Sequence, residues 1–82
     1  MTGFERYRRK KLISQAQLAK VLGVTPAAVS SWETKKSIPH AVMLKRLAGM
    51  YGVTVDDLLR TDYPDNDLDE QLNKAAEWIV KQ

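Results

Sequence analysis

The stretch that decides the fold is QAQLAKVLGVTPAAVSSWET, which runs from Gln15 to Thr34. It predicts two short helices joined by a tight corner. Gly23 can adopt the positive φ that ends a helix without steric strain. Thr25 is a good N-cap, and Pro26 suits the first position of the second helix. Two helices that meet through a short glycine-containing turn form a helix-turn-helix unit.

The apolar residues of this stretch predict that both helices contribute to one core. Leu18, Ala19 and Leu22 fall on one face of the first helix. Val29 and Trp32 lie three residues apart on the inner face of the second helix. Ala19 also supplies the small side chain that is needed where two helices cross. The whole set at these offsets is far more specific than a lone glycine between two helical patterns.

Length and composition describe one small domain. The chain has 82 residues and no cysteine, which excludes a disulfide framework and a cysteine-based zinc site. No apolar run approaches the ~20 residues that span a bilayer, and residues 1–11 do not resemble a signal peptide. We therefore expect a cytoplasmic protein with no membrane contact.

Residues suited to catalysis are scarce. A single histidine, no cysteine and no glycine-rich phosphate loop leave little from which to build a catalytic site. One acidic cluster resembles a calcium loop only loosely, since the central glycine and the final glutamate are missing: Asp65, Asp67, Asp69, Glu70. The sequence predicts a protein that is not an enzyme and that holds no cofactor or metal.

Charge is divided unequally along the chain. Residues 1–53 carry ten basic and two acidic side chains, whereas residues 54–82 carry three basic and eight acidic ones. A basic half is typical of a surface that binds a polyanion, although it can also be a solvated surface. Beside a helix-turn-helix unit, the basic half favours nucleic acid as the partner.

Capping residues and apolar spacing predict an all-α protein. Besides the two helices of the central stretch, helices are expected over 2–11, 40–51, 55–60 and 67–81. Residues 1–60 should form a compact five-helix domain, 61–66 a linker, and 67–82 an additional C-terminal amphipathic helix. Leu12 should extend the apolar stripe of the first helix, and Val42 and Met50 should belong to the apolar face of the fourth. Gly49 weakens that fourth helix by ~1 kcal/mol relative to alanine, and close packing is the reason we expect for it.

These residues resemble the Cro/C1-type (XRE, phage-repressor-like) helix-turn-helix family over roughly residues 3–59. The motif comprises five short groups: Ser14-Gln15, Leu18-Ala19, Gly23-Val24-Thr25, Val29-Ser30 and Trp32-Glu33. The resemblance implies a lambda-repressor-like domain of five helices that binds double-stranded operator DNA, usually as a homodimer, without enzymatic activity.

The second helix of the unit, Pro26 to Glu33, is the expected recognition helix. By resemblance Pro26, Ala27 and Ser31 match the base-contacting positions, and Ser30 also faces outward. No arginine, glutamine or asparagine is present on this helix to contact a base with two hydrogen bonds. We therefore expect modest direct readout, with DNA shape, water and half-site spacing adding specificity. Ala27 can alternatively be read as a good helix former.

Phosphate contacts are expected on both sides of this helix. Gln15 stands at a helix N-terminus, which attracts phosphate, and Ser14 or Gln17 can assist it; a solvated polar face is the alternative. Lys35 and Lys36 follow the recognition helix directly, and the family often has glycine at or near the position of Lys35. The predicted DNA-binding set is Gln15, Gln17, Thr25, Pro26, Ala27, Ser30, Ser31, Lys35 and Lys36. The resemblance further implies an ion pair between Arg8 and Glu33 that fixes the recognition helix.

The last predicted helix carries an apolar stripe that needs a cover. Its steps of three and four residues favour pairing with the same helix of a second subunit, through Leu68, Leu72, Ala75, Trp78 and Ile79. Packing on its own domain is the simpler alternative.

The sequence thus predicts a dimeric transcriptional regulator, most often a repressor of a pseudo-palindromic operator. The alternative function is an interaction module, such as an antitoxin or an anti-repressor partner, whose terminal helix binds another protein.

Overall fold

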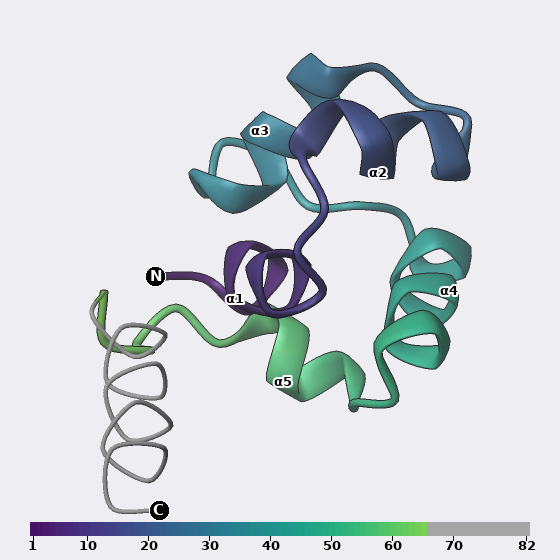
Figure 1. The fold of residues 1–82 in the computed structure, drawn as a ribbon. Coiled ribbons are helices and arrows are strands. Elements are labelled where there is room, and N and C mark those ends of the chain that lie inside the picture. The colour runs from purple at the N-terminus through teal and green to yellow at the C-terminus, as the bar shows by residue number, and fades with distance from the viewer. Residues whose placement is uncertain (66–82) are drawn as a thin grey trace, which may run out of the picture.

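The computed structural model describes residues 1–65, which form five helices and no strand (Figure 1). The helices are α1 (Gly3–Lys10), α2 (Gln15–Leu22), α3 (Pro26–Glu33), α4 (Ala41–Tyr51) and α5 (Val55–Leu59). The all-α prediction is confirmed over these residues, and the helix boundaries differ from the expected ones by a residue at most. The predicted helix over 67–81 and its dimerisation residues lie outside the described residues.

Each helix begins at a residue whose side chain accepts a hydrogen bond from a backbone N–H of the first turn. These N-caps are Thr2, Ser14, Thr25, His40 and Thr54. Such a cap satisfies one of the N–H groups that the helix leaves without a partner, and typically contributes ~1 kcal/mol. Polar residues in the connections therefore determine where the helices start.

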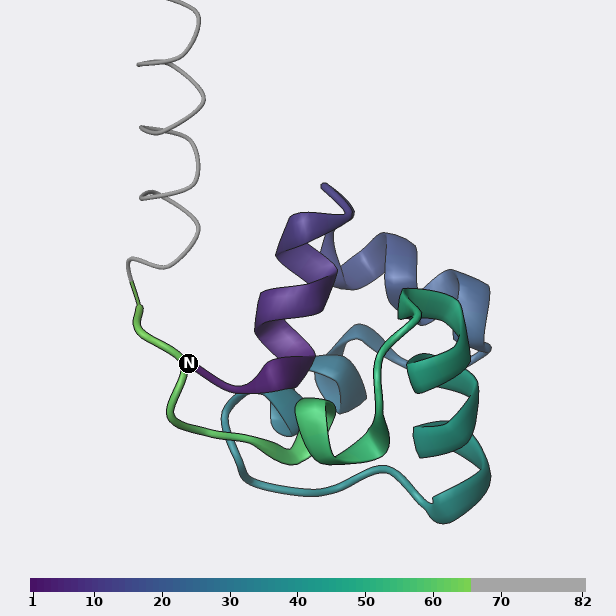
Figure 2. The ribbon, with the colours of Figure 1, turned by 90° about the horizontal axis from the view of Figure 1, so that it is seen from below.

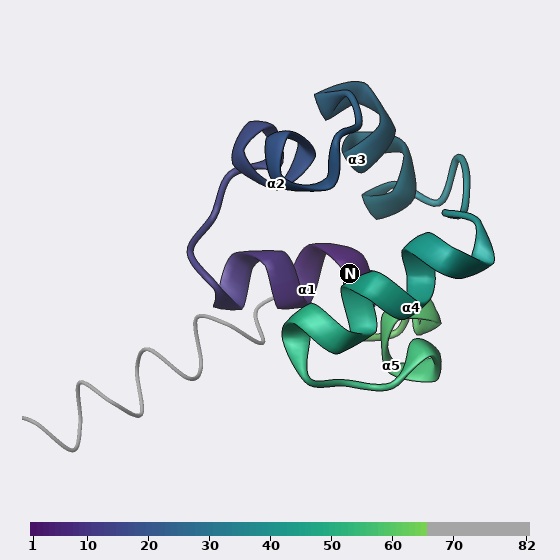
Figure 3. The ribbon, with the colours of Figure 1, turned by 90° about the vertical axis from the view of Figure 1, so that its right-hand side faces the viewer.

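The core lies between α1 and the other helices. Figure 1 shows α1 end-on, with α2 and α3 on one side, α5 on the other, and α4 beside them; Figure 3 shows the same grouping from the side. Every helix contributes buried apolar side chains: Phe4, Leu18, Ala19, Leu22, Val29, Trp32, Met43, Leu47, Ala48 and Leu58. The apolar residues predicted for the helix-turn-helix unit are all buried.

The chain after α5 closes over the N-terminus. Tyr63 falls within the predicted linker, yet it is only 6% exposed. Two guanidinium groups lie against its ring, with the Cζ atoms of Arg6 and Arg60 at 4.1 and 4.4 Å from the ring centroid. The amino group of Met1 donates to the Tyr63 carbonyl and to Asp65. Figure 2 shows the N-terminus beside the chain that follows α5. Tyr63 thus packs on the helical domain, whereas the residues on either side of it are exposed.

Three apolar residues are more exposed than their spacing predicts. Leu12 is 91% exposed and has a φ of 58°, because the chain turns sharply there between α1 and α2. Val42 and Met50 are 73% and 40% exposed, since α4 buries its opposite face. The predictions that these residues join the core are wrong. Close packing at Gly49 is also wrong, because a Cβ there would meet no atom within 4 Å.

Candidate nucleic-acid interface

The corner between α2 and α3 has the geometry that the sequence predicts. Gly23 has a φ of 73°, and the next residue, Val24, donates its N–H to the Ala19 carbonyl at 3.0 Å. Thr25 then accepts a hydrogen bond from the Ala28 N–H at 3.1 Å, which starts α3. Ala19 is buried at the contact between the two helices. These contacts fix the direction in which α3 leaves the corner.

The outer side of α3 carries small side chains. Its cap, Thr25, and its first residues, Pro26 and Ala27, are exposed, whereas Ser30 and Ser31 are half-buried. Figures 1 and 3 show α2 and α3 together at one edge of the molecule, away from α5. We call this the α2–α3 edge. The structure therefore brings the predicted base-contacting residues together at one edge.

A hydrogen-bonded network joins the end of α3 to α1. Arg8 donates to Glu33 through Nε at 2.6 Å and through Nη2 at 2.9 Å. Its remaining Nη1 donates to the Ile13 carbonyl at 2.8 Å. Glu33 is 6% exposed, and its hydrogen bonds raise the pKa of the Arg8 guanidinium above its ordinary value. The predicted ion pair is present, and its two-point geometry fixes both side chains.

Two further residues extend this network, and sequence reasoning did not predict their part in it. The amide Nε2 of Gln15 donates to Glu33 Oε1 at 3.1 Å, which links the first residue of α2 to α3. The hydroxyl of Thr2 donates to the Glu33 backbone carbonyl at 3.1 Å while it caps α1. The end of α3 is therefore held by groups from both α1 and α2. No sequence pattern indicated these contacts, because they connect residues far apart in the chain.

Tyr51 lies close enough to this network for the charge of Glu33 to affect its pKa. Burial raises the pKa of the Tyr51 hydroxyl to about 12, and the charge of Glu33 acts in the same direction. The hydroxyl is buried and has no hydrogen-bond partner among the described residues. Its ring lies 6.2 Å from that of Tyr7. The network thus borders a region with little water, where its hydrogen bonds are strengthened.

The predicted phosphate-binding residues differ in how free their side chains are. Gln17 accepts the Ser14 N–H through Oε1 at 2.8 Å and so completes a capping box at the start of α2. Lys35 and Lys36 are exposed on the loop after α3. Lys35 has a φ of 66°, the conformation that favours glycine. DNA contact by these residues stays a prediction.

The exposed charged side chains of the α2–α3 edge are all positive. Residues 14–40 contain three lysines, Lys20, Lys35 and Lys36, all of them exposed. Glu33 is the only acidic residue in this range, and it is buried against Arg8. The edge therefore presents positive charge to a partner, with no exposed carboxylate to repel a polyanion. Among residues 1–65 there is no group of three or more side chains that could hold a metal ion.

The buried corner, the capped outward helix and the basic edge together define a helix-turn-helix DNA-binding domain. The sequence pattern of the helix-turn-helix family matches residues 4–58, and the chain belongs to this family in its Cro/C1 (XRE) type. It is therefore a DNA-binding transcriptional regulator. In the described part of the chain, no helix is long and apolar enough to cross a membrane.

Two curated proteins are similar to the chain. One is the SPbeta prophage-derived uncharacterized HTH-type transcriptional regulator YonR of Bacillus subtilis (strain 168), 35% identical over 73 residues, which are 89% of this chain and 68% of YonR. The other is the HTH-type transcriptional activator BcrR of Enterococcus faecalis, 38% identical over 55 residues. That match covers 67% of this chain and only 27% of BcrR. No solved structure matches the chain.

Proposed function

We propose that the chain is a repressor that binds a pseudo-palindromic operator as a homodimer and blocks transcription by occupying it. The observation that carries the proposal is the α2–α3 edge, where an outward helix is flanked by lysines and its only carboxylate is buried and paired. DNA is the polyanion whose major groove admits a helix. The proposal places α3 in that groove.

The side chains of α3 suit shape-dependent recognition better than direct readout. Pro26 and Ala27 are short and exposed, so the start of α3 can approach the base edges closely. Ala27 can contact a thymine methyl group, and Ser30 and Ser31 can hydrogen-bond to more than one base. Groove width and deformability of the operator then contribute much of the specificity.

Phosphate contacts supply most of the affinity in this proposal. The backbone N–H of Gln15 lies at the start of α2. Lys35 and Lys36 both lie on the loop that follows α3. Lysines that contact phosphates release condensed counterions, so binding weakens steeply as salt increases. The hydrogen bond from Gln15 to Glu33 keeps the Gln15 side chain beside α3 rather than extended into solvent.

A single α3 helix discriminates weakly between DNA sequences, and dimerisation increases specificity because two α3 helices bind one operator. The proposal assigns it to residues 67–82, through the predicted stripe of Leu68, Leu72, Ala75, Trp78 and Ile79. Two α3 helices then enter successive major grooves about 34 Å apart. The two half-sites of the operator are inverted copies of one another.

Selection of bound sequences from a random DNA library tests the proposal. We expect an enriched site with two inverted half-sites, whose centres lie about 10 base pairs or a multiple of one turn apart. A reporter gene that carries this site upstream should be silenced when the protein is produced. Failure to enrich any DNA would contradict DNA recognition, and a site without symmetry would contradict the dimer. An induced reporter would make the protein an activator.

A further inference from the structure

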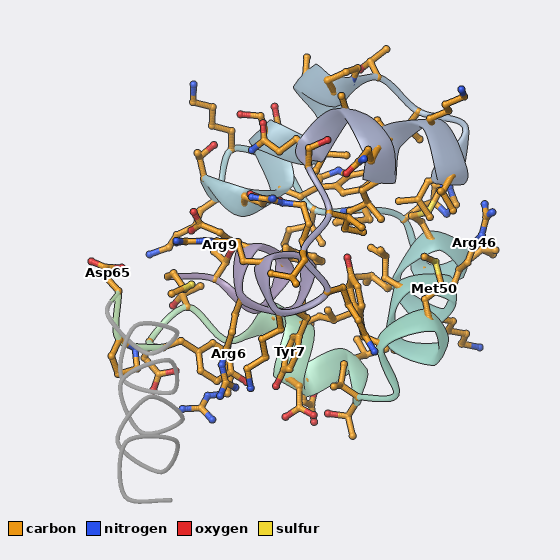
Figure 4. The ribbon with its side chains drawn as sticks, in the orientation of Figure 1. Arg6, Tyr7, Arg9, Arg46, Met50 and Asp65 are labelled. Carbon is orange, nitrogen blue, oxygen red and sulfur yellow. The ribbon has the colours of Figure 1, made fainter. Side chains whose placement is uncertain are left out.

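The outward face of α4 combines apolar and basic side chains and remains uncovered in the described part of the chain. Val42 of this helix is 73% exposed, and Met50 lies on its flank (Figure 4). Val42, Arg46 and Gly49 follow one another at steps of four and three residues, so they share one side of the helix. We call these four residues the α4 face.

Nothing within residues 1–65 accounts for Gly49. Glycine inside a helix costs about 1 kcal/mol relative to alanine. Here no positive φ requires it, and no neighbouring atom would meet an added Cβ. A missing side chain on an exposed helix face allows another backbone to approach closely. The α4 face therefore has the shape of a surface on which a second helix packs.

The surroundings of the α4 face are basic. Lys45 and Arg46 are exposed on α4, and neither α2 nor α4 contains an acidic residue. Arg46 donates through Nη2 to the Val21 carbonyl at 3.0 Å, which holds its guanidinium beside the end of α2. Val21 is itself 58% exposed on α2. A partner for this face should combine an apolar stripe with acidic flanks.

We propose that the α4 face binds residues 67–82 of a second copy of this chain, an inference that rests on the homodimer of the proposed function. This segment has the required chemistry, because its predicted apolar stripe is accompanied by four acidic residues and two lysines: Asp67, Asp69, Glu70, Glu77, Lys74 and Lys81. Its acidic residues complement Lys45 and Arg46, and Gly49 lets its stripe come close to α4. Each subunit then covers the α4 face of the other.

Reach favours the second copy over the same chain. Figure 4 shows Asp65 on the opposite side of the domain from Arg46 and Met50. In Figure 2 the coloured chain after α5 likewise ends on the side away from α4. Only one residue separates Asp65 from the predicted helix that begins at residue 67. A segment that starts on that side starts away from its own α4. The partner copy has no such restriction.

Cysteine cross-linking tests the arrangement directly, because the chain has no cysteine of its own. One preparation carries Gly49→Cys. The other carries a single cysteine in the stripe, as Leu72→Cys, Ala75→Cys or Ile79→Cys in turn, so that the register does not decide the outcome. The two full-length preparations are mixed under reducing conditions, allowed to exchange subunits, and then oxidised. We expect a disulfide between the two different chains to dominate for at least one stripe position.

Every other product overturns the inference in an identifiable way. Stripe-to-stripe disulfides would mean that the terminal segments pair with each other, and Gly49→Cys homodimers would mean that two α4 faces meet. No cross-linked product would mean that the segment does not reach α4. DNA binding of the same preparations, measured under reducing conditions, shows separately whether the proposed function holds.

A matched pair of substitutions measures the contribution of the α4 face. Val42→Gln removes exposed apolar surface from it, whereas Leu12→Gln removes similar surface elsewhere; both residues lie outside the core, so both variants should fold. Burial of a valine side chain corresponds to roughly a tenfold change in an equilibrium constant. Because each subunit covers the α4 face of the other, the dimer buries two Val42 side chains, and we expect Val42→Gln to weaken dimerisation about a hundredfold by sedimentation equilibrium. Leu12→Gln should leave dimerisation unchanged. Equal effects of the two variants would contradict the inference.

Discussion

At the scale of single residues, backbone conformation distinguishes Lys35 from its neighbour Lys36. Both are exposed lysines on the loop after α3, but only Lys35 has a positive φ. The loop bends there because the backbone N–H groups of Lys36 and Ser37 both point to the Ser31 carbonyl, at 2.9 and 3.3 Å. A residue with a Cβ is strained in this conformation by about 1 kcal/mol. The protein retains a lysine where glycine would relieve strain.

Substitution of Lys35 by glycine should separate stability from DNA affinity. Lys35→Gly should raise the free energy of unfolding by about 1 kcal/mol, because it relieves the positive φ. It should also weaken DNA binding and reduce the slope of log affinity against log salt by about 0.9 per subunit, because one cation is lost. Thermal unfolding and binding at several salt concentrations measure the two effects.

Lys36→Gly is the matched control, since it removes the same charge where φ is not positive. It should weaken DNA binding similarly but should lower stability, because glycine adds freedom to the unfolded chain. If Lys35→Gly were no more stable than Lys36→Gly, the strain assigned to Lys35 would be incorrect. If neither variant changed the salt dependence, the loop would not contact phosphate.

At the scale of the elements, α3 is positioned as much by its C-terminal end as by the corner before it. The corner is predictable from sequence because Gly23 and Thr25 act on their immediate neighbours. The far end depends on Glu33, which contacts α1 through Arg8 and α2 through Gln15. A buried carboxylate and its guanidinium stabilise a structure only while both are present. Removal of either one leaves the other buried without a partner.

Removal of one partner of the Arg8–Glu33 pair should therefore destabilise the domain strongly. Arg8→Ala should lower the free energy of unfolding by about 3 kcal/mol, a large share of the stability of a domain this small. Arg9→Ala, an exposed arginine on the same helix, should change it by less than about 0.5 kcal/mol. Urea denaturation monitored by circular dichroism measures both variants.

A double-mutant cycle shows whether the two side chains act together. Glu33→Ala should cost about as much as Arg8→Ala, and the double variant should cost clearly less than the two combined. A coupling of more than about 1 kcal/mol is expected for a pair with two hydrogen bonds between the side chains. Strictly additive losses would contradict the role given to the pair.

At the scale of the whole molecule, the sequence predicts the helices well and their outer surfaces poorly. Thr2, Ser14, Thr25 and Thr54 are recognisable as caps because capping is a local interaction. His40 was not predicted as a cap, although its Nδ1 accepts the Met43 N–H at 3.3 Å. Apolar spacing identified the core but also included Val42, since it cannot tell which side of a wide apolar face is buried.

Long-range contacts account for most of what the sequence could not predict. Tyr63 lies in a segment rich in aspartate and proline, whose composition favours a linker, yet its ring packs against the guanidinium groups of Arg6 and Arg60. Its hydroxyl lies 3.1 Å from that of Tyr7, 56 residues earlier in the chain. Composition describes a segment in isolation and holds no information about such partners. The predicted site residues, by contrast, lie within one short stretch and are brought together by local geometry.

The central claim is that the α2–α3 edge meets DNA with α3 in the major groove. The most direct test compares Ser31→Glu, which places a carboxylate on α3, with Thr61→Glu, which places the same charge on the exposed chain after α5. Both variants are measured on the selected operator by mobility shift, with circular dichroism to verify folding. We predict that Ser31→Glu abolishes specific binding while Thr61→Glu retains it within about twofold, since only the first charge faces phosphates and base edges. Unchanged binding by a folded Ser31→Glu protein would contradict the account.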